Sequence, residues 1–137
     1  MSAGLMQGRR GLIMGLANDK SIAWGIAQAL AGQGAELAFS YQGEALKKRV
    51  LPLAEKLGTP RVFECDVADM DSLDRLFAQL KELWGEIDFV VHAIGFSDKG
   101  ELRGRYVDTS RDNFLSTMDI SVYSFTAVCQ RAAAMMR

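Results

Sequence analysis

The sequence predicts an α/β fold in which helices cover both faces of a parallel β-sheet, with four strands and four helical segments in the chain. Two observations predict it. Short, nearly continuous apolar segments, typical of strands buried on both faces, alternate with segments whose apolar residues recur every three or four positions, as in packed helices. The connections are also short, so successive strands are expected to be parallel and joined through the helices.

The elements follow one another regularly along the chain. The expected strands are residues 10–15, 35–41, 61–67 and 87–95. The expected helices between them are residues 21–34, 44–58 and 69–85. The predicted buried stripe of the first helix consists of Ile22, Ile26, Ala29 and Leu30. That of the third consists of Leu73, Leu76, Leu80 and Leu83.

The helix ends carry recognisable signals. Each of the three helices stops at a glycine that can adopt the left-handed conformation of a C-terminal cap, namely Gly34, Gly58 and Gly85. Asp69 is placed to cap the start of the third helix. Pro52 inside the second helix predicts a kink or a break.

Residues 110–137 form a last helical segment that opens with the capping sequence TSRDNF. The fourth strand then has no partner for its outer edge, although a doubly wound sheet usually adds two further strands there. We therefore expect residues 1–137 to be a single domain that is either the N-terminal half of a larger domain or one whose missing part is supplied elsewhere.

Composition excludes several classes of function. The 137 residues carry a net charge of −1 and one short basic cluster at residues 47–49, so neither nucleic acid nor a membrane surface is an expected partner. Cys65 and Cys129 lie far apart and outside any metal-binding motif, which favours free thiols in a reducing compartment and no metal site. The apolar stretch after Arg9 and Arg10 is too short to span a membrane, so a cytoplasmic protein is expected.

The loop IMGLANDKSIAWGIA, residues 13–27, is the main candidate site. Gly15 ends the first strand, and Ser21 opens the next helix, where free backbone N–H groups and the helix dipole favour a phosphate. Gly25, one turn further, is expected to let the helix pack closely on the sheet. An ordinary turn capped by serine explains Gly15 and Ser21 equally well, and spacing alone does not separate the two interpretations.

The loop resembles that of NADH-dependent enoyl-acyl carrier protein reductases, a divergent branch of the short-chain dehydrogenases. The resemblance continues through GAELAFSYQ (34–42), CDVAD (65–69), VVHAIGF (90–96) and DISVYSF (119–125), and it spans essentially the whole chain. It implies a Rossmann-like fold that binds NADH and serves fatty-acid biosynthesis. The implied partners are an enoyl thioester carried on acyl carrier protein and further copies of the chain in a homotetramer.

The resemblance also implies roles for individual residues. Gly15 lines the turn, while Ser21 and Ile22 meet the pyrophosphate. Gln42 stands after the second strand, where the adenosine ribose is recognised, and a neutral side chain there favours NADH over NADPH. Lys47 and Lys48 keep NADPH open as a minor alternative.

At the third and fourth strands the resemblance assigns the rest of the site. Asp66 and Val67 flank the adenine, Ile94 runs beside the ribose and nicotinamide, and Ser97 touches the substrate. Asp66 is available for this role if Asp69 caps the following helix. On periodicity alone, Ile94 is simply a core residue.

Catalytic residues are not expected within residues 1–137. The family uses a tyrosine that donates to the thioester oxygen and a lysine that follows it after six intervening residues, both beyond the fifth strand. Tyr41 and Lys48 match this spacing, but they lie at the adenosine end of the site, so we reject them. We expect His92 to be a core residue with a backbone partner and assign Asp119 no catalytic role. Cys65 is expected to serve packing alone.

Two other functions remain open. An NADPH-dependent keto or carbonyl reductase of the same superfamily would usually have glycines in place of NDKSI and a basic residue near position 42. A non-catalytic NAD-binding or redox-sensing module would need no tyrosine–lysine pair. A receiver-type signalling domain is excluded, because no acidic cluster follows the first strand.

Overall fold

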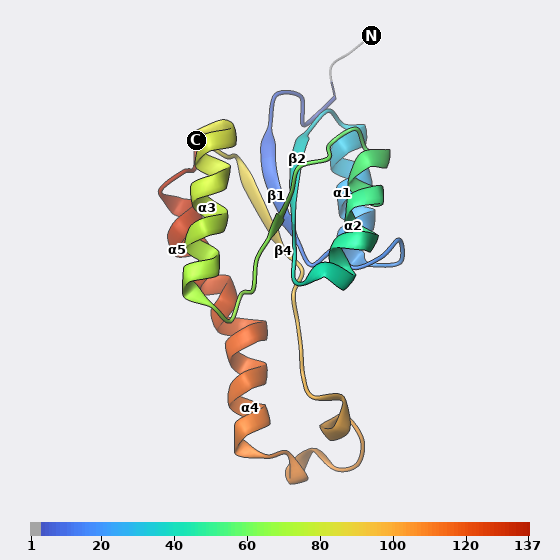
Figure 1. The fold of residues 1–137 in the computed structure, drawn as a ribbon, viewed down its shortest axis with the longest axis vertical. Helices are drawn as coiled ribbons and strands as arrows, with labels where there is room; N and C mark the ends of the chain where they lie inside the picture. Colours follow the sequence, from blue (N-terminus) through green and yellow to red (C-terminus); the bar gives the residue numbers. More distant parts are fainter. Residues whose placement is uncertain (1–3) are drawn as a thin grey trace.

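The computed structural model describes residues 4–137 and contains a four-stranded parallel sheet (Figure 1). The strands are β1 (Arg10–Met14), β2 (Glu36–Tyr41), β3 (Val62–Glu64) and β4 (Phe89–His92), in the order β3-β2-β1-β4. In register, Ile13 of β1 lies between Phe39 of β2 and Val91 of β4. The predicted α/β class and parallel sheet are confirmed.

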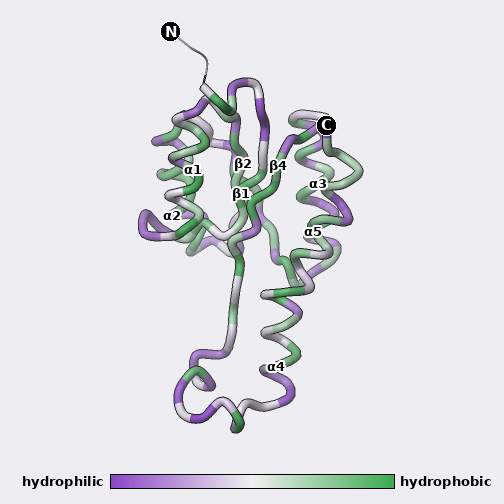
Figure 2. Tube along the Cα trace, turned by 180° about the vertical axis from the view of Figure 1, so that it is seen from behind, coloured by the Kyte–Doolittle hydropathy of each residue, from purple (hydrophilic) through white to green (hydrophobic). Residues whose placement is uncertain are grey.

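Helices cover both faces of this sheet. α1 (Ile22–Gly32) and α2 (Glu44–Lys56) lie on one face, and α3 (Met70–Trp84) and α5 (Ser124–Ala133) lie on the other (Figure 1). Alternate strand residues therefore enter separate cores: Leu12 and Met14 pack toward α3 and α5, whereas Ile13 packs toward α1 and α2. The apolar stretches of β1 and β4 run between the two helix pairs (Figure 2). Burial on both faces explains why the strand sequences do not alternate.

The predicted buried stripe of α1 was mostly wrong: Leu30 packs against the core, but Ile26 is only half-buried and Ala29 is exposed. Ile22 is 80% exposed, and the residues facing the sheet are Ala23, Trp24 and Ala27. The helix is apolar on nearly every side, so the spacing of its large aliphatic residues does not identify its inner face. Gly25 is also exposed, and a Cβ there would meet no atom within 4 Å, so this glycine does not provide the close packing expected of it.

The stripe of α3 was predicted more closely. Leu73, Leu76 and Leu80 are fully buried, but Leu83 is 39% exposed, near the end of the helix. α3 carries charged residues on its outer side, so the contrast between its faces marks the buried one.

The cap predictions hold. Gly34, Gly58 and Gly85 all have positive φ angles, of 96°, 70° and 77°. Asp69 accepts hydrogen bonds from the backbone N–H groups of Asp71 and Ser72 at the start of α3. Pro52 lies inside a continuous α2 and does not break it, contrary to one of the two expectations.

The predicted C-terminal helical segment is confirmed over residues 111–133, although a π-helical turn interrupts it and the last residues are not helical. After β4 the chain forms two short 3₁₀ turns, Lys99–Glu101 and Tyr106–Asp108, and then α4 (Arg111–Met118). We call these three elements the lobe, which projects beyond the carboxyl end of the sheet (Figure 1). Ser110 caps α4 by accepting from the N–H of Asn113, and a π-helical turn, η3 (Asp119–Tyr123), joins α4 to α5. Such wide turns interrupt α-helices and recur at functional sites.

The segment just before β4 pairs with the end of the chain, which the sequence did not predict. The chain is no longer helical after α5 ends at Ala133, and Met136 forms a parallel bridge with Ile87. The Ile87 N–H donates to the Met135 carbonyl at 2.9 Å, and the Arg137 N–H donates to the Ile87 carbonyl at 3.0 Å. Arg137 also pairs with Asp88 through its guanidinium. Residues 135–137 therefore begin to extend the sheet.

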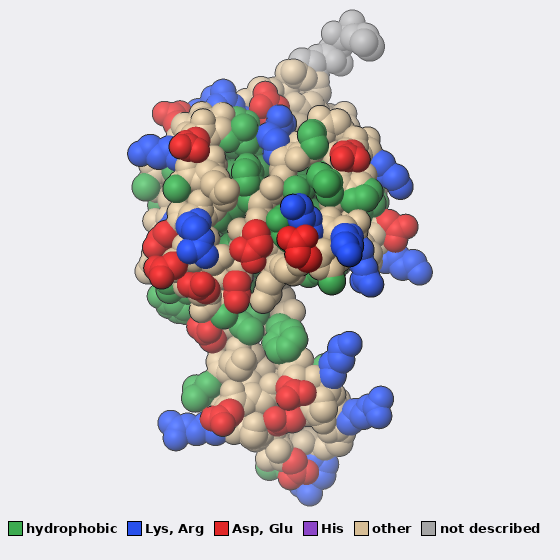
Figure 3. All heavy atoms as spheres, viewed as in Figure 1, with side chains coloured by type: hydrophobic (Ala, Val, Ile, Leu, Met, Phe, Trp, Pro, Cys, Tyr) green, Lys and Arg blue, Asp and Glu red, His purple; other side chains and the backbone are tan. Residues whose placement is uncertain are grey.

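On the face in Figure 3, acidic and basic side chains both occur over the body and the lobe, and acidic ones gather along the lower left of the body. Among residues 4–137, no helix is both long and apolar enough to cross a bilayer.

Candidate functional site

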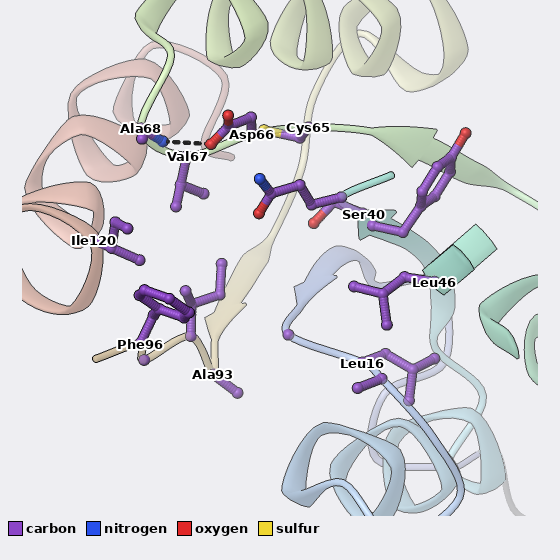
Figure 4. Close-up of a pocket in the computed structure, with 16 residues that line it drawn as sticks. Leu16, Ser40, Leu46, Cys65, Asp66, Val67, Ala68, Ala93, Phe96 and Ile120 are labelled. Carbon is purple, nitrogen blue, oxygen red and sulfur yellow. Dashed lines mark hydrogen bonds between the residues drawn. The ribbon is translucent and has the colours of Figure 1, made fainter. Parts of the chain in front are cut away.

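A cavity of about 450 Å³ opens at the carboxyl ends of the strands (Figure 4). The segments after all four strands contribute to it, through residues 15–17, 40–42, 65–68 and 93–96, and Leu46 and Ile120 complete it. Its volume falls within the range of small-molecule sites. It lies where the chain reverses its direction across the sheet, since β2 and β4 flank β1 on opposite sides. Open α/β sheets bind ligands in this crevice.

Gly15 is required by the backbone at this crevice. Its φ angle is 100°, and a Cβ on this residue would overlap the carbonyl group of Ala93. The loop after β1 therefore lies directly against the segment after β4. Only glycine gives both the left-handed conformation and this close approach without strain.

Ser21 closes the loop instead of capping α1. Its hydroxyl oxygen accepts from the N–H groups of Ala17 at 3.1 Å and Asn18 at 3.0 Å. The Ser21 hydroxyl is the acceptor in both hydrogen bonds, so its own hydrogen remains available to be donated to another group. Ile22 begins α1, where the first N–H groups have no acceptor within the helix. Ser21 and Ile22 stand beside the cavity and are not part of its lining.

The adenosine-side residues Gln42, Asp66 and Val67 all line the cavity, although they come from different strands. One carboxylate oxygen of Asp66 accepts from the N–H of Ala68 at 2.9 Å, so this side chain is not as free as the sequence suggested (Figure 4). Asp69 does cap α3, and the second carboxylate oxygen of Asp66 has no hydrogen-bond partner among the described residues. Val67 is 6% exposed and forms part of an apolar wall.

Ile94 lines the opposite part of the cavity. Figure 4 shows Val67, Ile120 and Phe96 on one side, facing Leu16 and Leu46 on the other. The ends of β2 and β3 thus supply polar groups, while apolar lining comes from every segment around the cavity, including the one after β4.

Ser97 is held away from the cavity lining. Its hydroxyl oxygen accepts from the amide of Asn113 at 3.2 Å and from the hydroxyl of Thr117 at 3.0 Å. Both partners belong to α4, so the structure gives Ser97 a contact within the protein that the sequence did not suggest.

His92 and Cys65 are packed residues. The Nε2 atom of His92 lies 2.7 Å from the hydroxyl of Ser124, which is fully buried and lies 2.6 Å from the Ile120 carbonyl. Because the serine hydroxyl donates to that carbonyl, Nε2 donates to the serine. The partner is thus a side chain and not the expected backbone group. Burial lowers the pKa of His92 and raises the pKa of the Cys65 thiol to about 11, so both side chains are neutral near pH 7.

The sequence did not assign Ile120, Leu46 or Ser121 to the site. Ile120 and Ser121 belong to the π-helical turn, and a helical repeat of 3.6 residues cannot place the side chains of such a turn. The one available signal was the segment DIS, residues 119–121, which contributes to the resemblance. Among residues 4–137, no group of three metal-ligating side chains comes together.

Comparison with known proteins gives a consistent result. The protein family described as "Enoyl-(Acyl carrier protein) reductase" matches residues 15–137. The curated Enoyl-[acyl-carrier-protein] reductase [NADH] 1 of Rhizobium meliloti is 64% identical over 135 residues, which cover 98% of this chain and 50% of that protein. The Enoyl-[acyl-carrier-protein] reductase [NADH] FabI of Aquifex aeolicus is 43% identical over 133 residues, which cover 97% of this chain and 49% of that protein.

Solved structures agree. The reductase from Anaplasma phagocytophilum, crystallised in complex with NAD, superimposes with a TM-score of 0.94 at 56% identity and covers 98% of this chain. The Aquifex aeolicus structure gives a TM-score of 0.95 at 42% identity, again over 98% of this chain. The matches cover 51% and 53% of those two chains. The chain spans about half the length of the curated relatives it matches.

Proposed function

The chain belongs to the enoyl-(acyl carrier protein) reductase family, and we propose that it forms the NADH-binding half of a reductase of fatty-acid biosynthesis. The reaction is reduction of the trans-2 double bond of an enoyl thioester. The observation that carries the proposal is the cavity at the reversal point of the sheet, to which the ends of all four strands contribute. The relatives named for NADH, and the neighbour crystallised with NAD, support this choice of cofactor.

The residues of the cavity fit a dinucleotide. The glycine turn at Gly15 and the first amides of α1, next to Ser21 and Ile22, suit the pyrophosphate because they present N–H groups at the positive end of a helix. Gln42 can donate and accept hydrogen bonds at the adenosine ribose. The Asp66 carboxylate can accept the adenine amine while Val67 packs on the ring.

At the other end, small residues leave room for a flat ring. Ala93 and Gly95 flank Ile94 in the wall, and we place the nicotinamide against this segment. When bound, NADH supplies the hydride that reduces the double bond. We place the enoyl chain beyond Phe96, on the side of Ser97. The contribution of this half is thus to hold and orient, which is how binding sites raise reaction rates through proximity.

The acid–base residues of the reaction are assigned to the other half. A donor to the thioester oxygen is needed as negative charge develops there. We place the tyrosine and lysine of the family beyond residue 137 and assign no catalytic residue within residues 1–137. We also propose a single dinucleotide-binding domain of which these residues are one part.

Exposed apolar residues support an assembly of several copies. Phe114, Leu115 and Met118 of α4 are 41–54% exposed, as are Val122 of the π-helical turn and Phe125 of α5. Covering such a surface is a common reason for association. We propose a cytoplasmic homotetramer that receives its substrate on acyl carrier protein.

A cofactor and substrate assay tests the proposal on the full-length protein. NADH oxidation with a crotonyl thioester is expected to exceed NADPH oxidation at least tenfold in kcat/KM. Preferential reduction of an acetoacetyl thioester with NADPH would instead identify a ketoreductase. NADH binding without turnover of any thioester would identify a non-catalytic module.

A further inference from the structure

The segment after β4 is clamped by one serine of the π-helical turn. The hydroxyl oxygen of Ser121 accepts from the N–H of Phe96 at 3.0 Å, and the same hydroxyl lies 3.2 Å from the Phe96 carbonyl, to which it donates. Both backbone polar groups of Phe96 therefore depend on one side chain. Phe96 also lines the cavity, and Gly95 beside it lies close to the same hydroxyl.

The π-helical turn is itself fixed to the sheet. The Ile120 carbonyl accepts from the buried hydroxyl of Ser124, which in turn contacts His92 of β4 at 2.7 Å. Ile120 then reaches the cavity, while the next residue, Ser121, reaches the backbone of Phe96. The turn is thus linked to the end of β4 through Ser124 of α5, and it contacts the segment after β4 directly.

A second clamp lies one step further along the chain. The amide oxygen of Asn113 accepts from the N–H of Asp98 at 3.0 Å, and its NH₂ group donates to the hydroxyl of Ser97. Residues 96, 97 and 98 are consequently all bonded to the helical segment that runs through α4 and the π-helical turn. The first clamp is the one adjacent to the cavity.

We propose that Ser121 is a positioning residue of the reductase, acting through the backbone of Phe96 to fix the wall formed by Ile94, Gly95 and Phe96. The inference rests on the proposed function, which places the nicotinamide and the reacting double bond against this wall. Transfer between two bound groups is sensitive to small displacements, so a looser wall lowers kcat more than it weakens cofactor binding. The adenosine end, at Gln42 and Asp66, is untouched and retains most of the affinity.

The test uses three variants of the full-length protein: Ser121→Ala, Ser121→Thr and the control Ser116→Ala. Ser116 is exposed on α4 and makes no side-chain hydrogen bond among the described residues. For Ser121→Ala we expect kcat to fall about tenfold, with the NADH dissociation constant changed less than threefold, because the lost bonds hold the wall and not the cofactor. Ser121→Thr keeps the hydroxyl and should retain at least a third of kcat. Ser116→Ala should match the wild type.

The outcomes separate the inference from the proposed function. Wild-type protein that fails to bind NADH or to reduce enoyl thioesters refutes the function itself. If the wild type is active, unchanged kcat in Ser121→Ala overturns the inference. An equal loss of kcat in a folded Ser121→Thr overturns it too, since the hydroxyl is present. A loss of kcat in Ser121→Ala that merely parallels a fall in melting temperature shows a purely structural role and also overturns it.

Discussion

Replacing Gly15 with alanine tests the geometry on which the cavity depends. At a φ of 100°, an alanine pays the left-handed penalty of about 1–2 kcal/mol. Its Cβ would also overlap the Ala93 carbonyl, a backbone group that cannot rotate away. Overpacking of this kind costs about 1–3 kcal/mol. We therefore expect Gly15→Ala to lower the free energy of unfolding by about 2–5 kcal/mol.

The same substitution should weaken cofactor binding. Relief of the overlap requires the loop after β1 to move away from the segment after β4, and these two segments form adjacent parts of the cavity. We expect the NADH dissociation constant of the full-length protein to rise at least about tenfold, which corresponds to about 1.4 kcal/mol. Urea unfolding and fluorescence titration with NADH measure the two effects separately.

Gly25→Ala is the matched control. It makes the same chemical change within α1, but its Cβ would meet no atom within 4 Å and its φ is not positive. Alanine is the better helix former by about 1 kcal/mol, so this variant should be as stable as the wild type or more so, with unchanged NADH affinity. The reasoning is refuted if Gly15→Ala retains both wild-type stability and wild-type affinity.

Three further predictions concern other parts of the chain. Gln42→Arg should raise kcat/KM with NADPH relative to NADH by about tenfold, because a cation at the end of β2 can pair with a 2′-phosphate. An unchanged ratio of the two kcat/KM values would show that the adenosine ribose does not bind beside residue 42. Asp88→Asn should cost about 1–3 kcal/mol of unfolding free energy at pH 7. The Arg137 guanidinium holds the pKa of Asp88 well below its ordinary range, so this contribution is present above about pH 4 and disappears as the pH falls through the lowered pKa. Unfolding curves of both proteins should therefore converge in acid, and a constant gap contradicts the assignment. Cys65 is buried, and its thiol pKa is raised to about 11. It should therefore resist iodoacetamide at pH 8 until urea unfolds the protein, as measured by peptide mass mapping. Rapid modification of Cys65 in the folded protein would contradict its burial.

The sequence predicts the sheet well because its strands are buried on both faces. Segments such as GLIM, residues 11–14, have no polar side to present to water, and only a strand between two helix layers accommodates them. The face of α1 was mispredicted for a related reason. Because α1 is apolar on nearly every side, its sequence does not distinguish an inner from an outer face. The small side chains of Ala23 and Ala27 let the helix approach the sheet, whereas the large side chain of Ile22 is exposed.

The sequence predicts the site residues whose positions follow from the order of the strands. It does not predict those whose positions follow from an irregular helical turn. Gly15, Gln42, Asp66 and Ile94 are widely separated in sequence, yet a parallel sheet brings the ends of their strands to one edge, and all four line the cavity. Ser121 depends instead on a π-helical turn, whose position no apolar repeat marks. Its contact with the segment after β4 is tertiary, so neither partner signals it alone.

Two of the predicted strands are longer than the observed ones, and their extra residues belong to the site. Residues 61–67 and 87–95 were predicted as strands, but β3 ends at Glu64 and β4 ends at His92. The surplus residues lie past the regular strands, although the N–H groups of Cys65 and Ala93 still donate to the carbonyls of Tyr41 and Met14, and residues 65–67 and 93–95 line the cavity. Apart from Asp66 they are apolar or glycine, and Cys65, Val67, Ala93 and Ile94 both line the cavity and pack against the two cores. An apolar run that continues past its strand at the carboxyl edge of a parallel sheet therefore indicates a binding site as well as a core, and in this chain it occurs after β3 and β4.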